Sequence, residues 1–353
     1  MTPPIPPIPP IPRVARSVLG PVAAGDLGFV LPHEHLAVDN RLHHAPQPGI
    51  EPSGRVTPER YGELRVYPHA LPDNLVLDDD AAVLADLRRY RALGGTTLVE
   101  LTPKGMGRDL GRLRALSAAS GVTVISGTGW YVQRAHGDLV AGRSVESLAG
   151  ELAADLTGPA ADAGVIGEIG IGKDDLADER RVLDAALLAS ARTGAPVWIH
   201  QTTTAPMRRL IDRLSLGDLD RDGVDRSRIV LCHTDYDLRD VGLHRAALAM
   251  GLIVELDLFG MPVWNRRNWV HAPDDTLRVE RLLELAADGL AGQLLISQDV
   301  CMKIQLSAYG GFGHGHLLAH VRELYDELGG TPDDWRTITE RTPARLLAWV
   351  EPG

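Results

Sequence analysis

The chain has 353 residues, of which 44% are hydrophobic and 24% charged, and its formal net charge is −11. This composition is typical of a globular protein with a large core, and the acidic balance argues against a nucleic-acid or anionic-membrane partner. There are only two cysteines, Cys232 and Cys301, and no apolar run of about 18 residues. We therefore expect no disulfide framework, no transmembrane helix and a cytoplasmic location.

The first twelve residues, MTPPIPPIPPIP, repeat the pattern Pro-Pro-Ile. Because proline blocks helix formation, we predict a disordered, extended tail over residues 1–12, followed by a single domain over residues 13–353. Residues 13–26 form a short lead-in that a small hairpin would fit.

The first predicted strand, residues 28–35, ends in two histidines, His33 and His35, with one residue between them. In an extended strand, side chains two positions apart point to the same side, so both imidazoles would project towards one point. Two neutral imidazoles side by side are a natural start to a divalent-metal site. After this strand, residues 40–77 lack clear periodicity, and a loop of that length suggests a cover over a functional site.

The rest of the chain alternates between apolar runs and amphipathic segments. With the first strand, the predicted strands are residues 28–35, 96–101, 122–127, 165–170, 196–200, 229–233, 252–256 and 293–298. The predicted helices are residues 78–93, 110–119, 144–156, 179–192, 205–214, 238–250, 277–288 and 315–328, with an appended segment over residues 332–349.

Continuous apolar strands that alternate strictly with helices indicate a parallel sheet covered on both faces. Eight such units predict the α/β class and a (β/α)8 TIM barrel. A doubly wound open sheet is the alternative, but no glycine-rich phosphate loop follows the first strand.

Polar side chains follow several predicted strands at their carboxyl ends, where the active site of such a barrel lies. They are four histidines and two carboxylates: His33, His35, Glu168, His200, His233 and Asp299. Zinc, manganese, cobalt and iron all accept such nitrogen and oxygen ligands.

Six protein ligands are too many for one tetrahedral ion that keeps a position open for water, so we predict two divalent metal ions, with zinc as the first choice. One ion would take His33, His35 and Asp299. The other would take His200 and His233, and Glu168 would bridge the two ions.

Several short motifs resemble the phosphotriesterase-like family of the amidohydrolase superfamily. They are HEHL, VIGEIG, WIHQ, CHTD and SQD in this order, together with GMGRD at residues 105–109, GTGWY at 127–131 and TPARLL at 342–347. The resemblance spans nearly the whole chain after the proline tail. It implies a TIM barrel with a binuclear metal site made of the six ligands above, and it suggests a homodimer.

The chain differs from many members of that family at the bridging position. Those members bridge their metals with a carboxylated lysine, whereas this chain offers Glu168, as in a subgroup of phosphotriesterase homology proteins. Lys173, five residues further on, is then a solvated charge. Thr342 stands where the family usually has asparagine.

Such a site would hydrolyse a small molecule. A hydroxide that bridges the metals would attack a carbonyl or phosphoryl group, and Asp299 would take the proton and shuttle it to the leaving group. Our first choice is ester or lactone hydrolysis, our second is phosphotriester or phosphodiester cleavage, and our third is hydrolysis of an N-acyl amide.

Mostly aromatic residues near the strand ends are the candidates for a substrate pocket: Trp130, Tyr131, Thr202, Asp235, Tyr236, Phe259 and Trp264. Their aromatic character suggests an apolar acyl or aryl group on the substrate. Tyr131 resembles a tyrosine that lactonases of the family place near the lactone ring oxygen. By strand alternation, we expect Cys232 to face away from the metals.

Two other classes of function fit the sequence less well. A deaminase of the wider superfamily would use one metal and a glutamate shortly after His200, and residues 201–204 supply no glutamate. A binding protein that had kept only the barrel would be expected to lose metal ligands, and none is missing.

Overall fold

The computed structural model of the protein describes residues 13–201, 204–215, 223–236, 238–261, 264–265, 270–271 and 273–350. The disordered tail predicted over residues 1–12 therefore lies outside the described residues.

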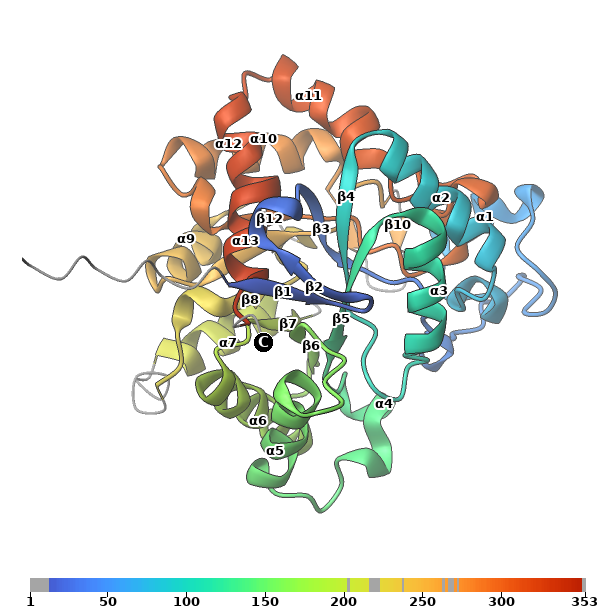
Figure 1. Ribbon diagram of the computed structural model, residues 1–353. Helices are drawn as coiled ribbons and strands as arrows, with labels where there is room; N and C mark the ends of the chain where they lie inside the picture. Colours follow the sequence, from blue (N-terminus) through green and yellow to red (C-terminus); the bar gives the residue numbers. More distant parts are fainter. Residues whose placement is uncertain are drawn as a thin grey trace, which may run out of the picture.

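An eight-stranded parallel sheet forms the centre of the described part of the chain, and it confirms the predicted TIM barrel (Figure 1). Its strands, in spatial order, are β3 (Phe29–Glu34), β4 (Gly95–Glu100), β5 (Thr123–Thr128), β6 (Val165–Ile171), β7 (Val197–Gln201), β8 (Ile229–Leu231), β9 (Ile253–Leu256) and β12 (Leu294–Ile296). At the seam between β12 and β3, the Ser297 hydroxyl and the Asp299 N–H both donate to the His33 carbonyl, at 2.9 and 3.2 Å. These bonds bring the barrel close to full closure.

Helices surround the sheet and connect its strands (Figure 1). They are α2 (Asp80–Ala92), α3 (Leu110–Ser120), α5 (Val145–Thr157), α6 (Ala177–Thr193), α7 (Thr204–Ser215), α9 (Gly242–Ala249) and α10 (Asp275–Ala287). Several begin after a side chain that accepts a first-turn N–H, as Asp109 does for α3 and Ser144 does for α5. Gly121 and Gly194 end α3 and α6 in the left-handed conformation that glycine adopts at low cost.

The carboxyl-terminal helices are less regular than the sequence predicts. Residues 317–321 form a π-helical turn before α11 (Arg322–Glu327), so the predicted helix over residues 315–328 is only partly α-helical. A second π-helical turn over residues 337–341 lies between α12 (Pro332–Arg336) and α13 (Thr342–Leu347).

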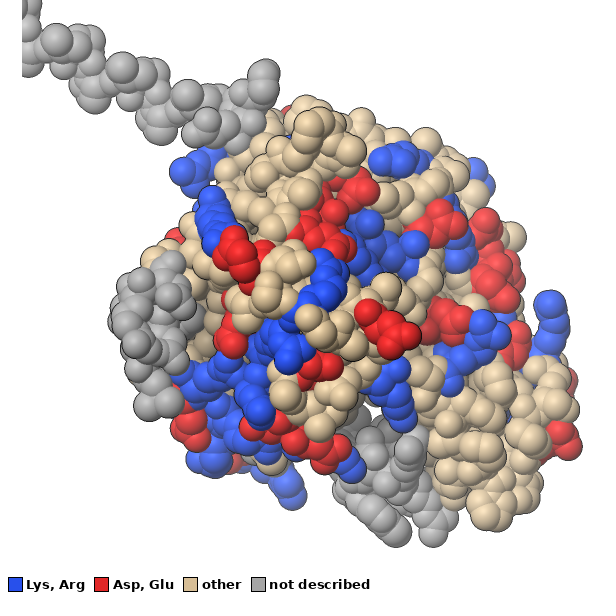
Figure 2. Space-filling view, turned by 90° about the horizontal axis from the view of Figure 1, so that it is seen from below, with Lys and Arg blue, Asp and Glu red and all other residues tan. Residues whose placement is uncertain are grey.

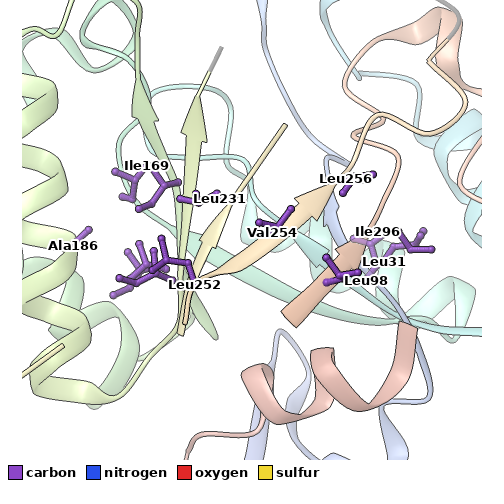
Figure 3. Packing of buried hydrophobic residues seen from close by; sticks show 14 of the residues in the cluster. Leu31, Leu98, Ile169, Ala186, Leu231, Leu252, Val254, Leu256 and Ile296 are labelled. Carbon is purple, nitrogen blue, oxygen red and sulfur yellow. The ribbon is translucent and has the colours of Figure 1, made fainter. Parts of the chain in front are cut away.

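The apolar core has two layers, as expected for strands with alternating sides. The larger layer packs between the sheet and the helices, and Figure 3 shows part of it, with Leu31, Leu98, Leu231 and Val254 among its labelled residues. A second layer fills the barrel interior with the opposite set of strand residues, which includes Val30, Val99, Ile125, Val165, Trp198, Val230, Ile253 and Leu295.

The amino-terminal end of the barrel is closed by the two ends of the described chain. β1 (Val14–Ser17) and β2 (Gly20–Ala23) form the hairpin considered from the sequence, and it crosses the barrel in Figure 1. Val14 pairs with Val350, and Leu346 and Leu347 of α13 join the interior layer. The carboxyl end of the strands is therefore the end that remains for a site. Residues 40–77, which include α1 (Tyr61–Val66), reach this end, where Asn40 Nδ2 donates to the Cys301 carbonyl.

The surface carries charges of both signs. In the face shown in Figure 2, acidic and basic side chains are interspersed, and no broad basic area covers it. Among the described residues, no helix is long and apolar enough to cross a membrane.

Candidate metal centre and active site

The six predicted ligands meet at the carboxyl end of the barrel, and each of them is buried. Glu168 from β6 lies at their centre. Its Oε1 atom is 2.6 Å from His200 Nδ1, 3.0 Å from His233 Nε2 and 3.5 Å from His33 Nε2. Asp299 Oδ1 is 3.3 Å from His35 Nε2. The structure thus brings together the two groups that the sequence assigned to two ions, with Glu168 between them.

Two of the histidines are oriented by carboxylates behind the site. His233 Nδ1 lies 2.8 Å from Asp257 Oδ1, and His33 Nδ1 lies 3.1 Å from Glu255 Oε2 and 3.2 Å from Asp257 Oδ2. An imidazole that donates its Nδ1 proton to a carboxylate keeps its lone pair on Nε2. The Nε2 atoms of both histidines can therefore serve as metal ligands.

The other two histidines are oriented by hydroxyl groups. His35 Nδ1 is 2.9 Å from Thr102 Oγ1, and this hydroxyl in turn donates to Glu100. His200 Nε2 is 3.0 Å from the Tyr131 hydroxyl, which leaves Nδ1 facing Glu168. Metal-ligating histidines in proteins are held in this way through their second ring nitrogen. All four rings thus present a lone pair to the same small volume.

Two buried atoms of the site have no hydrogen-bond partner among the described residues: His33 Nε2 and Asp299 Oδ1. Polar atoms buried in this way are rare unless an ion or a water completes their bonding. Burial alone would raise the pKa of Glu168, but His200 and the other imidazoles hold the pKa of this carboxyl well below its ordinary value. A buried carboxylate, four imidazole lone pairs and an unpartnered aspartate oxygen fit divalent transition metals.

His233 and Asp299 follow short strands, and both have a left-handed backbone conformation where the chain turns towards the other ligands. β8 ends at Leu231 and β12 at Ile296, and His233 and Asp299 then adopt φ values of 51° and 46°. Non-glycine residues with such left-handed φ values are strained and are frequent at functional sites.

This backbone turn also corrects one sequence-based expectation. Cys232 does not face away from the barrel interior, because alternation places Val230 and Cys232 in the interior layer and Leu231 in the outer one, and it is His233, with its left-handed φ, that departs from the alternation. Its side chain belongs to the interior layer of the barrel, and its sulfur lies beside the side chains of His33, Glu255 and Asp257. Cys232 therefore packs directly beneath the site.

Glu34, the residue between the first two histidines, holds the loop that carries Asp299. Its fully buried carboxylate accepts hydrogen bonds from the Ser297 hydroxyl and from the N–H groups of Gln298 and Val300, at 2.8 to 2.9 Å. Burial raises the pKa of Glu34 to about 7 despite these bonds. Strand alternation alone would only place Glu34 on the side opposite the two histidines.

Glu255 and Asp257 are functional candidates that the sequence analysis missed. They lie two positions apart at the end of β9, in the apolar segment LIVELDLFG, and both are fully buried. This spacing was a usable signal, because two carboxylates on one side of a buried strand need partners. Although burial alone would raise the pKa of Asp257, His233 and His33 hold it below its ordinary value.

Asp257 contacts the Nδ1 atoms of both His33 and His233, and this leads to a prediction. We expect Asp257→Asn to weaken metal binding by about 10- to 100-fold, because an amide no longer orients both His33 and His233 as an anion does. Competition with a chelating dye measures this affinity. Asp212→Asn, an exposed change on α7, is the matched control and should bind like the wild type. Unchanged affinity in Asp257→Asn would refute its orienting role.

Three of the predicted pocket residues make contacts elsewhere in the fold. Trp130 is 1% exposed, belongs to the outer layer and packs against the cations of Lys104 and Arg143. Asp235 is also buried, and its Oδ2 atom accepts bonds from Arg278 Nε and the Leu258 N–H, at 2.6 and 3.0 Å.

Phe259 is buried as well, and the Arg278 guanidinium lies 5.8 Å from its ring centroid. The structure thus shows Asp235 paired with Arg278 inside the fold and Trp130 and Phe259 packed in the apolar core, and their place in a substrate pocket stays a prediction.

The two predicted tyrosines do lie beside the metal ligands. The ring centroids of Tyr131 and His200 are 4.5 Å apart, and those of Tyr236 and His233 are 6.1 Å apart. Tyr236 also lines a small cavity of about 80 Å³ that His233 and Arg208 border. Thr202 and the side chain of Trp264 lie outside the described residues.

Comparison with known proteins places this arrangement among characterised folds. Residues 14–347 match the model of the Phosphotriesterase family. A protein from Salmo salar named N-acetyltaurine hydrolase is 33% identical over 316 residues, which cover 87% of this chain and 89% of that protein.

Two solved structures extend the comparison. A resiniferatoxin-binding protein from Rhodobacter sphaeroides is 31% identical, has a TM-score of 0.89 and covers 98% of both chains. A phosphotriesterase homology protein from Escherichia coli, complexed with phosphate in its active site, has a TM-score of 0.73 at 24% identity. The alignment with it covers 91% of this chain and 99% of that one, and it supports the shared fold.

Proposed function

We propose that this chain, which belongs to the phosphotriesterase family, is a hydrolase that uses two divalent metal ions to cleave the amide bond of an N-acylated amino compound. One observation carries the metal-dependent part. Four imidazoles, each oriented through its second nitrogen, converge on the buried carboxylates of Glu168 and Asp299. The choice of an amide is supported by the 33% identity to a protein named N-acetyltaurine hydrolase over 87% of this chain.

The residues have separate tasks in this proposal. His33, His35 and Asp299 would hold one ion, His200 and His233 the other, and Glu168 would contact both. Bound divalent ions of this kind acidify water and polarise a carbonyl group.

Asp299 is the base in this proposal, because its Oδ1 atom lies 4.0 Å from His33 Nε2 and 3.3 Å from His35 Nε2, beside the proposed ligands of one ion. It would accept the proton of the attacking water and deliver it to the amide nitrogen, which must be protonated before it leaves as an amine.

Tyr131 has a positioning task. Burial raises the pKa of its phenol well above the ordinary value, so the hydroxyl stays neutral. It holds His200 through Nε2, and this fixes the ring with Nδ1 facing Glu168.

Ester or lactone hydrolysis is the second candidate function. The chemistry at the carbonyl is the same, and Tyr131, the residue that resembles the lactonase tyrosine, lies next to a metal-ligand histidine. We place amide hydrolysis first because a relative named N-acetyltaurine hydrolase is 33% identical to this chain over 87% of its length. Phosphotriester cleavage would use the same residues.

A substrate panel tests this order. We expect metal-loaded protein to hydrolyse N-acetyltaurine and related N-acyl amino acids with a higher kcat/KM than lactones, aryl esters or organophosphates. Release of the free amine, measured by derivatisation, provides the assay for the amides. Rapid lactone hydrolysis without amine release would replace the first candidate with the second.

A further inference from the structure

A short series of side chains leads from the metal ligands towards the surface. The Tyr131 ring lies against the His200 imidazole. The His43 ring also lies near Tyr131, and the centroids of these two rings are 5.9 Å apart. His43 belongs to the loop that follows β3, and its Nδ1 atom lies 3.0 Å from Arg134 Nη2. Arg134 is in α4 (Gln133–His136), which follows β5. Both loops therefore leave the carboxyl ends of strands, the side on which the metal ligands lie.

The charge at the outer end of this series is fixed. A guanidinium is protonated at any physiological pH and has no acceptor atom, so Arg134 donates to His43 Nδ1. No carboxylate of the described residues lies within 4.0 Å of Arg134 as an ion-pair partner, and its side chain is exposed. A cation is thus available at this position in a chain whose net charge is −11.

We propose that Arg134, supported by His43, forms an anion subsite on the segments that follow β3 and β5, at the carboxyl end of the barrel. It would hold the sulfonate or carboxylate group on the amino half of the substrate while the acyl carbonyl lies at the metal ligands. The subsite rests on the proposed amide hydrolysis and narrows its substrates to N-acyl amino acids with a terminal oxyanion.

The substrate is shorter than the series of side chains, so the long Arg134 side chain would have to extend over Tyr131 towards it. Two ring-to-ring steps, of 4.5 and 5.9 Å, lead from His200 through Tyr131 to His43. In N-acetyltaurine, one nitrogen and two carbons separate the acyl carbon from the sulfonate, a span of roughly 5 Å with ordinary bond lengths. An arginine fork matches oxyanions geometrically and forms charge-assisted hydrogen bonds with them.

The experiment compares three matched amides on the wild type and on Arg134→Met. N-acetyltaurine carries a sulfonate, N-acetyl-β-alanine carries a carboxylate on the same spacer, and N-propylacetamide is neutral. We expect Arg134→Met to raise KM for at least one anionic amide by about 10- to 100-fold, with kcat changed less than about threefold. The KM for N-propylacetamide should stay constant. The larger of the two anion effects identifies the preferred oxyanion.

Two further arginine variants test whether the effect on KM for anionic amides belongs to Arg134. Arg88→Met changes an exposed arginine on α2 and should behave like the wild type with all three amides. Arg208→Met changes the arginine beside the cavity near His233. The proposal is overturned if Arg208→Met removes the preference for anions and Arg134→Met does not, or if no anion preference exists.

Binding without turnover separates this proposal from the proposed function. Calorimetry with N-acetyltaurine on metal-loaded Asp299→Asn should show binding that the added Arg134→Met change weakens at least about 10-fold. If the wild type cleaves no amide but this binding difference is found, the reaction is wrong and the subsite stands. If the wild type cleaves amides and Arg134→Met alters neither binding nor KM, the subsite is wrong and the reaction stands.

Discussion

Replacing Asp299 by Asn should lower kcat by about 10³-fold and leave the barrel folded. A carboxylate can take the proton of the attacking water, whereas an amide cannot, and general-base groups typically contribute 10²- to 10⁴-fold. The loop should keep its shape, because it is held through other atoms. The Asp299 N–H donates to the His33 carbonyl, and Gln305 Nε2 donates to the Asp299 carbonyl.

Steady-state kinetics on metal-loaded protein measure this effect. Thermal unfolding checks the fold, and metal analysis checks that Asp299→Asn, which changes a proposed ligand, still holds two ions. Asp333→Asn, which changes an exposed aspartate in α12, serves as the control and should keep full turnover. Near-normal turnover in Asp299→Asn would contradict its role as the base. It would leave the position of this side chain at the ligand cluster without a catalytic explanation.

Replacing Glu168 by Gln should have the second large effect, on both metal ions together. Its Oε1 atom lies within 3.5 Å of ligand nitrogens from both groups, those of His33, His200 and His233. A neutral amide is a weaker ligand and no longer balances the charge of two cations. We expect affinity for both ions to fall at least 100-fold, the upper end of what an orienting residue contributes, and turnover to fall with it.

Equilibrium dialysis followed by metal analysis measures this loss. Glu146→Gln is the matched control, because Glu146 is an exposed carboxylate paired with Arg192 on the surface. If Glu168→Gln bound two ions with unchanged affinity, Glu168 would not be the bridge. The two groups of histidines would then have to be joined by a different residue.

The barrel could be predicted from the sequence because its strands are apolar runs bounded by glycine-rich turns and helices. Each predicted strand overlaps an observed one, as residues 165–170 overlap β6. The six ligands followed from the same pattern, because each of them lies in a strand or within three residues of its carboxyl end. Helix irregularities such as the π-helical turn at residues 317–321 leave no comparable signal in residue spacing.

Side-chain direction beyond a strand end could not be predicted in the same way. Alternation holds only while the backbone is extended, and the left-handed φ of His233 ends it one residue after Cys232. Because alternation gives no side-chain direction in loops, it also could not tell which of two neighbouring aromatic residues would contact a ligand histidine. Trp130 and Tyr131 are neighbours in a loop, but Tyr131 contacts the ligand His200, whereas Trp130 packs against the cations of Lys104 and Arg143.

The orienting carboxylates depend on contacts between distant parts of the chain. Glu255 lies 222 residues from His33 in sequence, and no local spacing connects them. Only the closed barrel places β9 behind β3, so Glu255 and Asp257 could be recognised as buried carboxylates without their partners being identified.

The metal content of the purified wild-type protein tests the central claim most directly. We expect mass spectrometry to find about two transition-metal ions per chain after loading, as a bridged pair requires. Exhaustive chelation should abolish hydrolysis, and adding divalent metal back should restore it. A protein that binds no transition metal, or one that keeps full activity after complete chelation, would contradict the account.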